Sequence, residues 1–253
     1  MGLFDKFKRK ENAPEEIKKN ETAKPSGEKV DLTKKINLAK EEVHKICLTK
    51  KPLANLTARV GLVLDYSGSM SDLYYRGTVQ EVIEKMLPIA MNFDDDGSME
   101  VWIFENGFHR LPDITLDNLA DYVKKEITGK DYRMGGTNYA PVIKNVTETY
   151  RESKKGNDKL PAYVIYITDG DNSDKSNTDA AILEASKYPI FWQFVGVGNA
   201  GFDYLRKLDD MEGRYVDNAD FFSVSEAGDI TYEALLNEFP GWLANQKVKT
   251  MLL

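Results

Sequence analysis

Cysteine and histidine are scarce in this chain of 253 residues, which has one cysteine, Cys47, and two histidines, His44 and His109. A single cysteine cannot form an intrachain disulfide, and it excludes a cysteine-rich zinc site. The two histidines also disfavour a histidine-based metal centre. Any metal site in this protein should therefore be built from oxygen ligands.

Long hydrophobic runs are absent as well. No apolar stretch approaches the roughly 18 residues that a membrane-spanning helix needs, and the basic N-terminus is not followed by the apolar core of a signal peptide. We therefore expect a cytoplasmic protein, and an adhesion role outside the cell is disfavoured. With 42% hydrophobic and 30% charged residues, the composition is that of a globular protein with a core of normal size.

The net charge of −7 is unevenly distributed. Residues 1–51 carry 14 Lys and Arg against 9 Asp and Glu, whereas residues 52–253 carry 20 basic and 32 acidic residues. The acidic body should repel nucleic acid, so no nucleic-acid partner is expected. The first ten residues, "MGLFDKFKRK", mix apolar and basic side chains. Such a segment could contact an anionic membrane from one side, or it could be a solvated tail.

Composition and periodicity divide the chain into three parts. Residues 1–30 are polar and contain proline, and they are expected to form a basic, flexible tail and linker. Residues 31–52 should form an amphipathic helix, and residues 53–250 should form the main domain. The apolar side chains of the helix recur at spacings of three and four: Leu32, Ile36, Ala39, Val43 and Ile46.

From residue 57 onward, buried strands alternate with helices. The segments "ARVGLVLD", "AYVIYITD" and "PIFWQFVGVG" are nearly continuous apolar runs, as in strands that are covered on both faces. A hairpin is predicted across Asn106-Gly107, and helices are predicted near 116–126 and, as the last element, 229–247. The pattern predicts an α/β fold with a doubly wound, mostly parallel central sheet flanked by helices, similar to a Rossmann fold, with one β-hairpin edge strand.

Oxygen-bearing side chains follow the predicted strands. In "VLDYSGSM", Asp65, Ser67 and Ser69 alternate along extended backbone, so all three can face one point. Thr137 in "RMGGTNYAP" and Asp169 in "YITDGDNSD" lie in two further loops. The carboxyl ends of parallel strands meet at one edge of a doubly wound sheet, where ligands bind. Carboxylates and hydroxyls together favour Mg²⁺, Mn²⁺ or Ca²⁺.

This arrangement of D-x-S-x-S, a distant Thr and a distant Asp resembles the metal-ion-dependent adhesion site of von Willebrand factor A (vWA) domains, and all five positions match. The resemblance implies a non-enzymatic protein-binding domain. Ser67, Ser69 and Thr137 would contact the ion directly, and Asp65 and Asp169 would hold it mainly through waters. An Asp or Glu of a protein partner would complete the shell.

The later segments "ITDGDNSDK", "FWQFVGVGNAGFDYL" and "LLNEFPGWL" are similar to the intracellular branch of this family that is associated with tellurium resistance and stress (TerF-like). The resemblance also implies a coupling between the metal site and movement of the final helix, expected near 229–247.

Two other functions remain open from the sequence. The segment "GVGNAG", Gly196 to Gly201, fits a dinucleotide-binding fingerprint, with Asp217 near the position of a ribose-binding acid. A magnesium-dependent phosphotransferase of the haloacid-dehalogenase type would also place an Asp at the end of the first strand, as Asp65 is placed. That class needs a second Asp two residues later, where this chain has Ser67.

Overall fold

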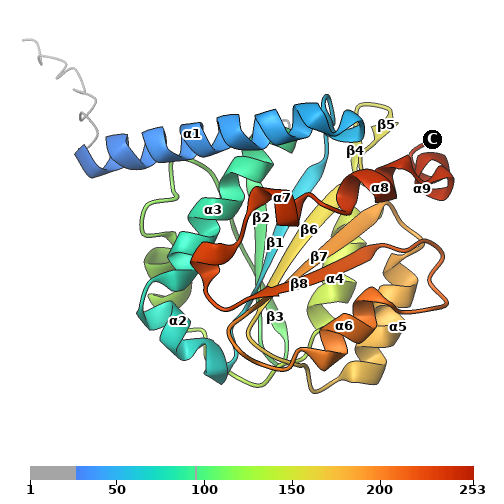
Figure 1. Ribbon diagram of the computed structural model, residues 1–253. Coiled ribbons are helices and arrows are strands. Elements are labelled where there is room, and N and C mark those ends of the chain that lie inside the picture. Colours follow the sequence, from blue (N-terminus) through green and yellow to red (C-terminus); the bar gives the residue numbers. More distant parts are fainter. Residues whose placement is uncertain (1–26, 95) are drawn as a thin grey trace, which may run out of the picture.

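The computed structural model describes residues 27–94 and 96–253 (Figure 1). The membrane contact suggested for residues 1–10, and most of the tail and linker expected over 1–30, lie outside the described residues. Within the described residues, no helix is long and apolar enough to cross a membrane.

A six-stranded sheet forms the centre of the molecule, in the order β3-β2-β1-β6-β7-β8. All neighbouring pairs are parallel except β2 and β3, which form the hairpin at one edge. The α/β fold class predicted from the sequence is therefore confirmed. The six strands are β1 (Arg59–Asp65), β2 (Met99–Phe104), β3 (Phe108–Ile114), β6 (Ala162–Thr168), β7 (Ile190–Val197) and β8 (Ala219–Val224), and a separate small hairpin is formed by β4 (Lys154–Lys155) and β5 (Asp158–Lys159).

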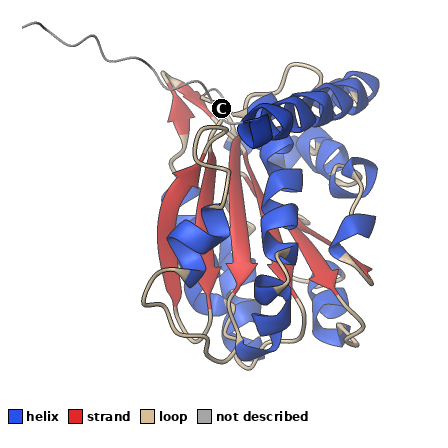
Figure 2. Cartoon of the chain, turned by 90° about the vertical axis from the view of Figure 1, so that its left-hand side faces the viewer, coloured by secondary structure: helices blue, strands red, loops and turns tan. Residues whose placement is uncertain are grey.

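The order in which strands are added to the sheet reverses at β1. The chain leaves β1 for β2 on one side, and it later returns to β6 on the other side. Ligands of doubly wound sheets bind at such a switch point, at the carboxyl ends of the strands. The parallel strands all end at the lower end of the molecule in Figures 1 and 2. The fold therefore predicts a site between the ends of β1 and β6.

Helices cover both faces of the sheet (Figures 1 and 2). On one face, α1, α3, α7 and α8 share a core with the sheet, and on the other face α4, α5 and α6 share a second core. The helices are α1 (Gly27–Thr49), α2 (Ser71–Tyr75), α3 (Thr78–Phe93), α4 (Ala140–Tyr150), α5 (Lys175–Ala185), α6 (Asp203–Asp209), α7 (Tyr232–Leu235), α8 (Phe239–Ala244), α9 (Gln246–Met251), the 3-10 helices η1 (Lys51–Leu53), η2 (Gly68–Met70) and η4 (Ala227–Asp229), and the π-helix η3 (Val123–Thr128).

Alternate residues of the central strands enter the two cores. On β1, Leu62 and Leu64 face the core of α1 and α3, whereas Val63 between them faces the core of α4 and α5. Every residue of β6 and β7 is buried. Strands that are covered on both faces are apolar at nearly every position, which explains their almost continuous hydrophobic runs.

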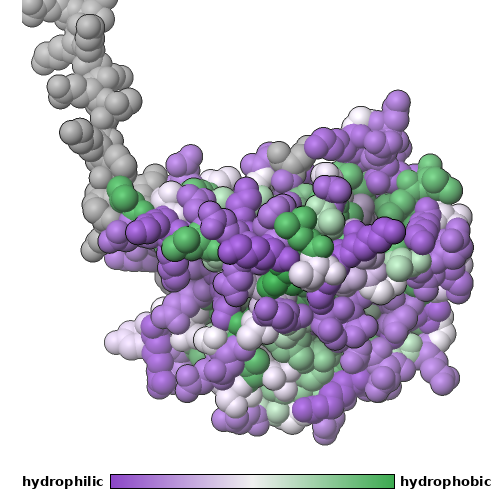
Figure 3. Space-filling model, turned by 45° about the horizontal axis from the view of Figure 1, so that its top comes forward, coloured by the Kyte–Doolittle hydropathy of each residue, from purple (hydrophilic) through white to green (hydrophobic). Residues whose placement is uncertain are grey.

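Helix α1 lies across the end of the molecule where the parallel strands begin (Figure 1). It starts at Gly27, four residues before the helix that the sequence predicts over 31–52. Its inner residues Ile36 and Val43 are buried against α3 and the sheet. On its outer side, Val30 and Leu38 are about half exposed. Figure 3 shows this end of the molecule as separate hydrophobic areas among hydrophilic residues.

The prediction of a single helix over 229–247 is wrong, because this segment contains the end of η4, all of α7 and α8, and the start of α9. Pro240 has no N–H to donate to the carbonyl of Leu236; α7 ends at Leu235, and α8 begins at Phe239 with Pro240 in its first turn, where a missing N–H is tolerated. The Leu236 carbonyl instead accepts a hydrogen bond of 2.7 Å from Lys50 Nζ. The coupling implied between the metal site and movement of the final helix stays a prediction, and the last helices of the described chain are α8 and α9.

The helix predicted near 116–126 is also misplaced. The described backbone there has turns, followed by the π-helix η3 over Val123–Thr128. Asp121, immediately before it, has a φ of 59°. A residue in the left-handed region interrupts a right-handed helix, so regular helix can begin only after it.

Candidate metal centre

Asp65 ends β1 and is completely buried. Its Oδ1 atom accepts a hydrogen bond of 2.7 Å from the backbone N–H of Ser67. Its Oδ2 atom accepts a hydrogen bond of 2.6 Å from the hydroxyl of Thr168, the last residue of β6. The carboxylate of Asp65 therefore joins the two central strands at the switch point of the sheet.

Two serine hydroxyls extend from this point toward the second carboxylate. The Oγ atoms of Ser67 and Ser69 are 3.1 Å apart. Ser69 donates a hydrogen bond of 2.9 Å to Oδ1 of Asp169, which directly follows β6. Three predicted oxygen ligands from two loops therefore form one continuous chain. Ser67 is buried, whereas Ser69 is exposed, so the chain leads from the interior to the surface.

Thr137 is placed at the same edge by its backbone. Gly135, two residues earlier, forms a parallel bridge with Ser67, and its carbonyl accepts a hydrogen bond of 3.1 Å from the N–H of Gly68. The carbonyl of Thr137 itself accepts a hydrogen bond of 2.7 Å from the N–H of Ser173 in the loop after β6. Within the described part of the chain, the Thr137 hydroxyl forms no hydrogen bond.

Gly135 and Gly136 bring this loop close to the hairpin of β2 and β3. A Cβ atom on Gly136 would lie 2.6 Å from Oδ1 of Asn106. A Cβ atom on Gly135 would lie 2.9 Å from both Asn106 and Glu105. The nearest atoms are the ends of the Asn106 and Glu105 side chains, so a larger residue at either position would require these side chains to move. The two glycines therefore allow the Thr137 loop to lie close to the hairpin without displacing them.

Asp174, in the loop after β6, connects this loop to the start of α4. The sequence does not identify it as a residue that supports the site. Its carboxylate accepts the backbone N–H groups of Tyr139 and Ala140, at 2.9 and 3.0 Å, and so satisfies the start of α4. The Tyr139 hydroxyl in turn donates to the Thr168 hydroxyl at 3.1 Å, which donates to Asp65. The candidate ligands therefore rest on a network of buried hydrogen bonds.

The negative charges of Asp65 and Asp169 are not balanced by a nearby basic side chain of the described residues. Burial raises the pKa of Asp65 to about 6, and the nearby charge of Asp169 also raises it. The pKa of Asp169 is raised as well, again by burial. Among residues 27–94 and 96–253, neither carboxylate has an ion pair with a basic side chain. Since buried carboxylates are normally paired or bound to a metal, this edge of the sheet lacks a positive charge.

The donor atoms suit a hard cation. Hydroxyl and carboxylate oxygens are ligands for Mg²⁺, Mn²⁺ and Ca²⁺, and the five candidate residues offer no nitrogen or sulfur. In the described residues, no group of three or more His, Cys, Asp or Glu could hold a metal ion. The candidate centre is not such a group, because only two of its five residues, Asp65 and Asp169, are acidic.

Packing and ion pairing account for the residues of the two alternative motifs. A Cβ atom on Gly196 would lie 2.7 Å from the ring of Phe202, so this glycine of "GVGNAG" is required by packing. Asp217 forms an ion pair of 2.7 Å with Arg214. At the position of a phosphotransferase's second Asp, Ser67 supplies a hydroxyl, which cannot act as a carboxylic acid–base group.

Comparisons with known proteins identify the family. The family model vWA-TerF-like, described as the vWA found in the TerF C terminus, matches residues 57–252. The uncharacterized protein YcbR of Bacillus subtilis (strain 168) is 43% identical over 220 residues, which cover 85% of this chain and 88% of that protein.

Two solved structures match this chain at low sequence identity. Proximal thread matrix protein 1 from the mussel byssus, solved with a zinc-occupied MIDAS motif, is 15% identical with a TM-score of 0.50 over 75% of this chain and 48% of that one. A von Willebrand factor type A protein from Catenulispora acidiphila is 15% identical with a TM-score of 0.48 over 78% of this chain and 43% of that one. This chain thus spans less than half of either solved chain. The family match and the B. subtilis relative show that the chain belongs to the vWA-TerF-like family, the vWA domains of the TerF C terminus.

Proposed function

We propose that this protein binds a protein partner through a divalent cation at the candidate metal centre. Ser67, Ser69 and Thr137 contact the ion directly, and Asp65 and Asp169 hold it mainly through waters. The observation that carries the proposal is the pair of carboxylates without a basic partner, joined to two serine hydroxyls at the switch point. A bound cation supplies the missing positive charge.

The ligand set explains why a partner is needed. Three direct ligands are neutral hydroxyls, so the ion keeps most of its positive charge and a further site for an anionic ligand. Mg²⁺ prefers six oxygen ligands and gives up its waters reluctantly. A carboxylate from an Asp or Glu of the partner neutralises the ion and completes its shell. Mg²⁺ is the proposed ion, with Mn²⁺ or Ca²⁺ as alternatives.

The activity is binding rather than catalysis, as is general for vWA domains, which are interaction modules. Because the family model takes its description from TerF proteins, a role in tellurium resistance or stress is the proposed setting, in the cytoplasm. Survival of a deletion strain on tellurite tests that setting, and complementation with the parent or the Ser69→Ala protein tests whether the metal site is needed for it.

Thermal unfolding tests the metal site. The melting temperature should rise when Mg²⁺, Mn²⁺ or Ca²⁺ replaces EDTA, because a ligand that binds only the native state stabilises it by RT ln(1 + [L]/Kd). Ser69→Ala is the main variant, since this exposed side chain is not part of a core. Thr149→Ala, which removes an exposed hydroxyl from α4, is the control. A rise of equal size in Ser69→Ala and the control would refute the proposed site.

Contact of residues 1–10 with anionic membranes is a separate proposal, based on the charge of that segment. The full chain should sediment with vesicles that contain anionic lipid, and a chain that lacks residues 1–10 should not. Equal sedimentation of the two chains would contradict it.

A further inference from the structure

A cavity of about 500 Å³ lies directly beside the candidate metal centre. It is lined from one side by α2 and the start of α3, and from the other side by the segment 121–134. Ser71, in its lining, is only two residues after Ser69, so their Cα atoms are at most about 7.6 Å apart. Met134, also in its lining, is three residues before Thr137.

The wall of this cavity is continuous with the metal site. Tyr74 lines the cavity, and its hydroxyl donates a hydrogen bond of 2.9 Å to the carbonyl of Asp65. Tyr74 and Val123 are each 5% exposed and form a fixed apolar surface. At the rim, the neighbouring Tyr75 is 92% exposed. Tyrosine is one of the residue types that contribute most to protein binding once a partner covers it.

The second wall has an unusual backbone that is held rigidly. Asp121, with a φ of 59°, and the π-helix η3 both line the cavity. Gln80 of α3 fixes this wall, because its side chain accepts the N–H of Val123 at 3.0 Å and donates to the carbonyl of Leu119 at 2.8 Å. Backbone strain and π-helices are concentrated at functional sites. The cavity is therefore shaped before a partner binds.

The charges around the cavity include one acidic residue of the lining, Asp121, which pairs with Lys125 at 3.8 Å, so the basic groups without such a partner favour an acidic ligand. Within the described residues, Lys124 in the lining has no acidic partner, whereas Lys130 of the same segment pairs with Glu126 at 3.3 Å. Arg133, next to Met134, also has no ion pair there. These two cations stand out in a body that carries 32 acidic and 20 basic residues over 52–253.

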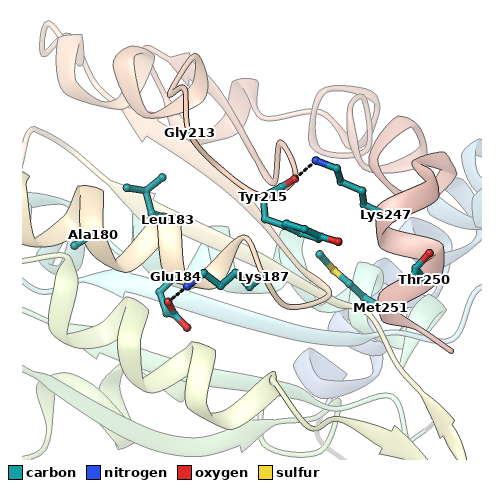
Figure 4. Close-up of a pocket in the computed structure, with 9 residues that line it drawn as sticks. All are labelled: Ala180, Leu183, Glu184, Lys187, Gly213, Tyr215, Lys247, Thr250 and Met251. Atoms are coloured by element: carbon teal, nitrogen blue, oxygen red, sulfur yellow. Dashed lines mark hydrogen bonds and ion pairs between the residues drawn. The ribbon is translucent and has the colours of Figure 1, made fainter.

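A second cavity offers a contrast. It has a volume of about 750 Å³ and lies between α5 and α9 (Figure 4). Both of its lysines are occupied: Lys187 pairs with Glu184 at 2.5 Å, and Lys247 donates to the carbonyl of Tyr215 at 2.6 Å. This cavity therefore offers an acidic segment neither a free cation nor a neighbouring metal site.

We propose that the cavity beside the metal centre binds a large apolar side chain of the partner, next to the acidic residue that the ion binds. The partner is an acidic peptide segment. It places one Asp or Glu on the ion, an aromatic or large aliphatic residue one or two positions away in the cavity, and further acidic groups near Lys124 and Arg133. This inference rests on the proposed function and specifies the partner of the same site.

Selection from a phage-displayed library of random peptides tests this inference. The full chain is immobilised in Mg²⁺, and bound phage are released with EDTA. The released peptides should contain an Asp or Glu with an aromatic or large aliphatic residue one or two positions away. Changing the acidic residue of a selected synthetic peptide to its amide, or its apolar neighbour to alanine, should each abolish or greatly weaken binding.

Variants of the protein locate the contact. Tyr75→Ala should lose about tenfold in affinity for a selected peptide. Lys124→Ala should lose about threefold, as expected for an exposed charge pair. The controls are Tyr215→Ala, which removes an exposed tyrosine at the other cavity, and Lys130→Ala, which removes a paired lysine, and both should bind as the parent does.

The outcomes separate this inference from the proposed function. EDTA-released peptides without an apolar preference that bind Tyr75→Ala as tightly as the parent would overturn the inference and leave the metal site intact. If EDTA releases no peptide, or if Ser69→Ala binds the selected peptides equally well, the metal-dependent function itself fails. The inference about the cavity then fails with it.

Discussion

Replacing Asp65 with asparagine should make the metal-free protein more stable rather than less. The carboxylate is completely buried, and burial raises its pKa to about 6. An unfolded chain would ionise this group near pH 4, a difference of about two pKa units or about 3 kcal/mol at pH 7. This free energy opposes folding whenever the cation is absent. Asparagine removes the charge and therefore the cost.

The replacement has a smaller cost of its own. The carbonyl oxygen of the new amide can keep accepting from Ser67, but its NH₂ group then faces the Thr168 hydroxyl. That hydroxyl can turn to the carbonyl of Gly170, which lies 3.2 Å away. The loss is about 1 kcal/mol, the value of one ordinary hydrogen bond. In EDTA at neutral pH, the variant should therefore be more stable by about 2 kcal/mol.

The sign of the pH dependence follows from the raised pKa. Below about pH 4 the group is protonated in both the folded and the unfolded state, so the charge costs nothing. Between about pH 4 and pH 6 the unfolded chain releases its proton first, and the stability of the parent falls. Above that range the cost is constant. The advantage of the variant should therefore appear only as the pH rises through this window.

Urea unfolding in EDTA at about pH 4 and about pH 7 measures this difference. Adding Mg²⁺ should reverse the order at pH 7, because the parent gains about 2.7 kcal/mol at a hundredfold excess over Kd and the variant gains little. A variant that is less stable than the parent in EDTA at pH 7 would refute the reasoning. So would an advantage of the same size at both pH values.

Three further predictions concern the support of the site and a second acidic group. Asp174→Ala should cost about 2 kcal/mol in urea unfolding, since two backbone N–H groups of α4 lose their acceptor. Gly136→Ala should raise the Mg²⁺ concentration needed for half-maximal stabilisation only slightly, because its Cβ would push aside the exposed Asn106 side chain next to the Thr137 loop, whereas Gly228→Ala, with open space around it, should not change it. Asp209→Asn should stabilise the protein by about 1 kcal/mol at pH 7 and by nothing below about pH 4. Burial raises the pKa of Asp209 to about 6, and stability is lost as the pH rises through this range.

The sequence predicts the sheet and the location of the candidate site well, because both follow from local patterns. Continuous apolar runs identify the strands that are covered on both faces. The extended backbone predicted through Ser69 is wrong, because Gly68–Met70 form the 3-10 helix η2. The Ser67 and Ser69 hydroxyls are nevertheless 3.1 Å apart, and Ser69 donates to Asp169. Parallel strands end together, so residues a hundred positions apart in the chain meet at one edge.

The parts that the sequence does not predict depend on contacts between distant segments. Asp174 is one of several aspartates in "DGDNSDK", and nothing local shows that it caps α4. The break before α8 is visible as Pro240, but the hydrogen bond from Lys50 to the freed carbonyl is not. The cavity beside the metal centre combines α2, α3 and η3, and the left-handed Asp121 that shifts this helix has no glycine or proline to mark it.

Helix α1 and the candidate metal centre lie at opposite ends of the molecule (Figure 1). Gly27, where the described chain begins, lies at the end opposite to the metal centre (Figure 1). The described chain therefore enters the domain at the end opposite the candidate site. Helix α1 covers only that far end, so it leaves the proposed binding face open.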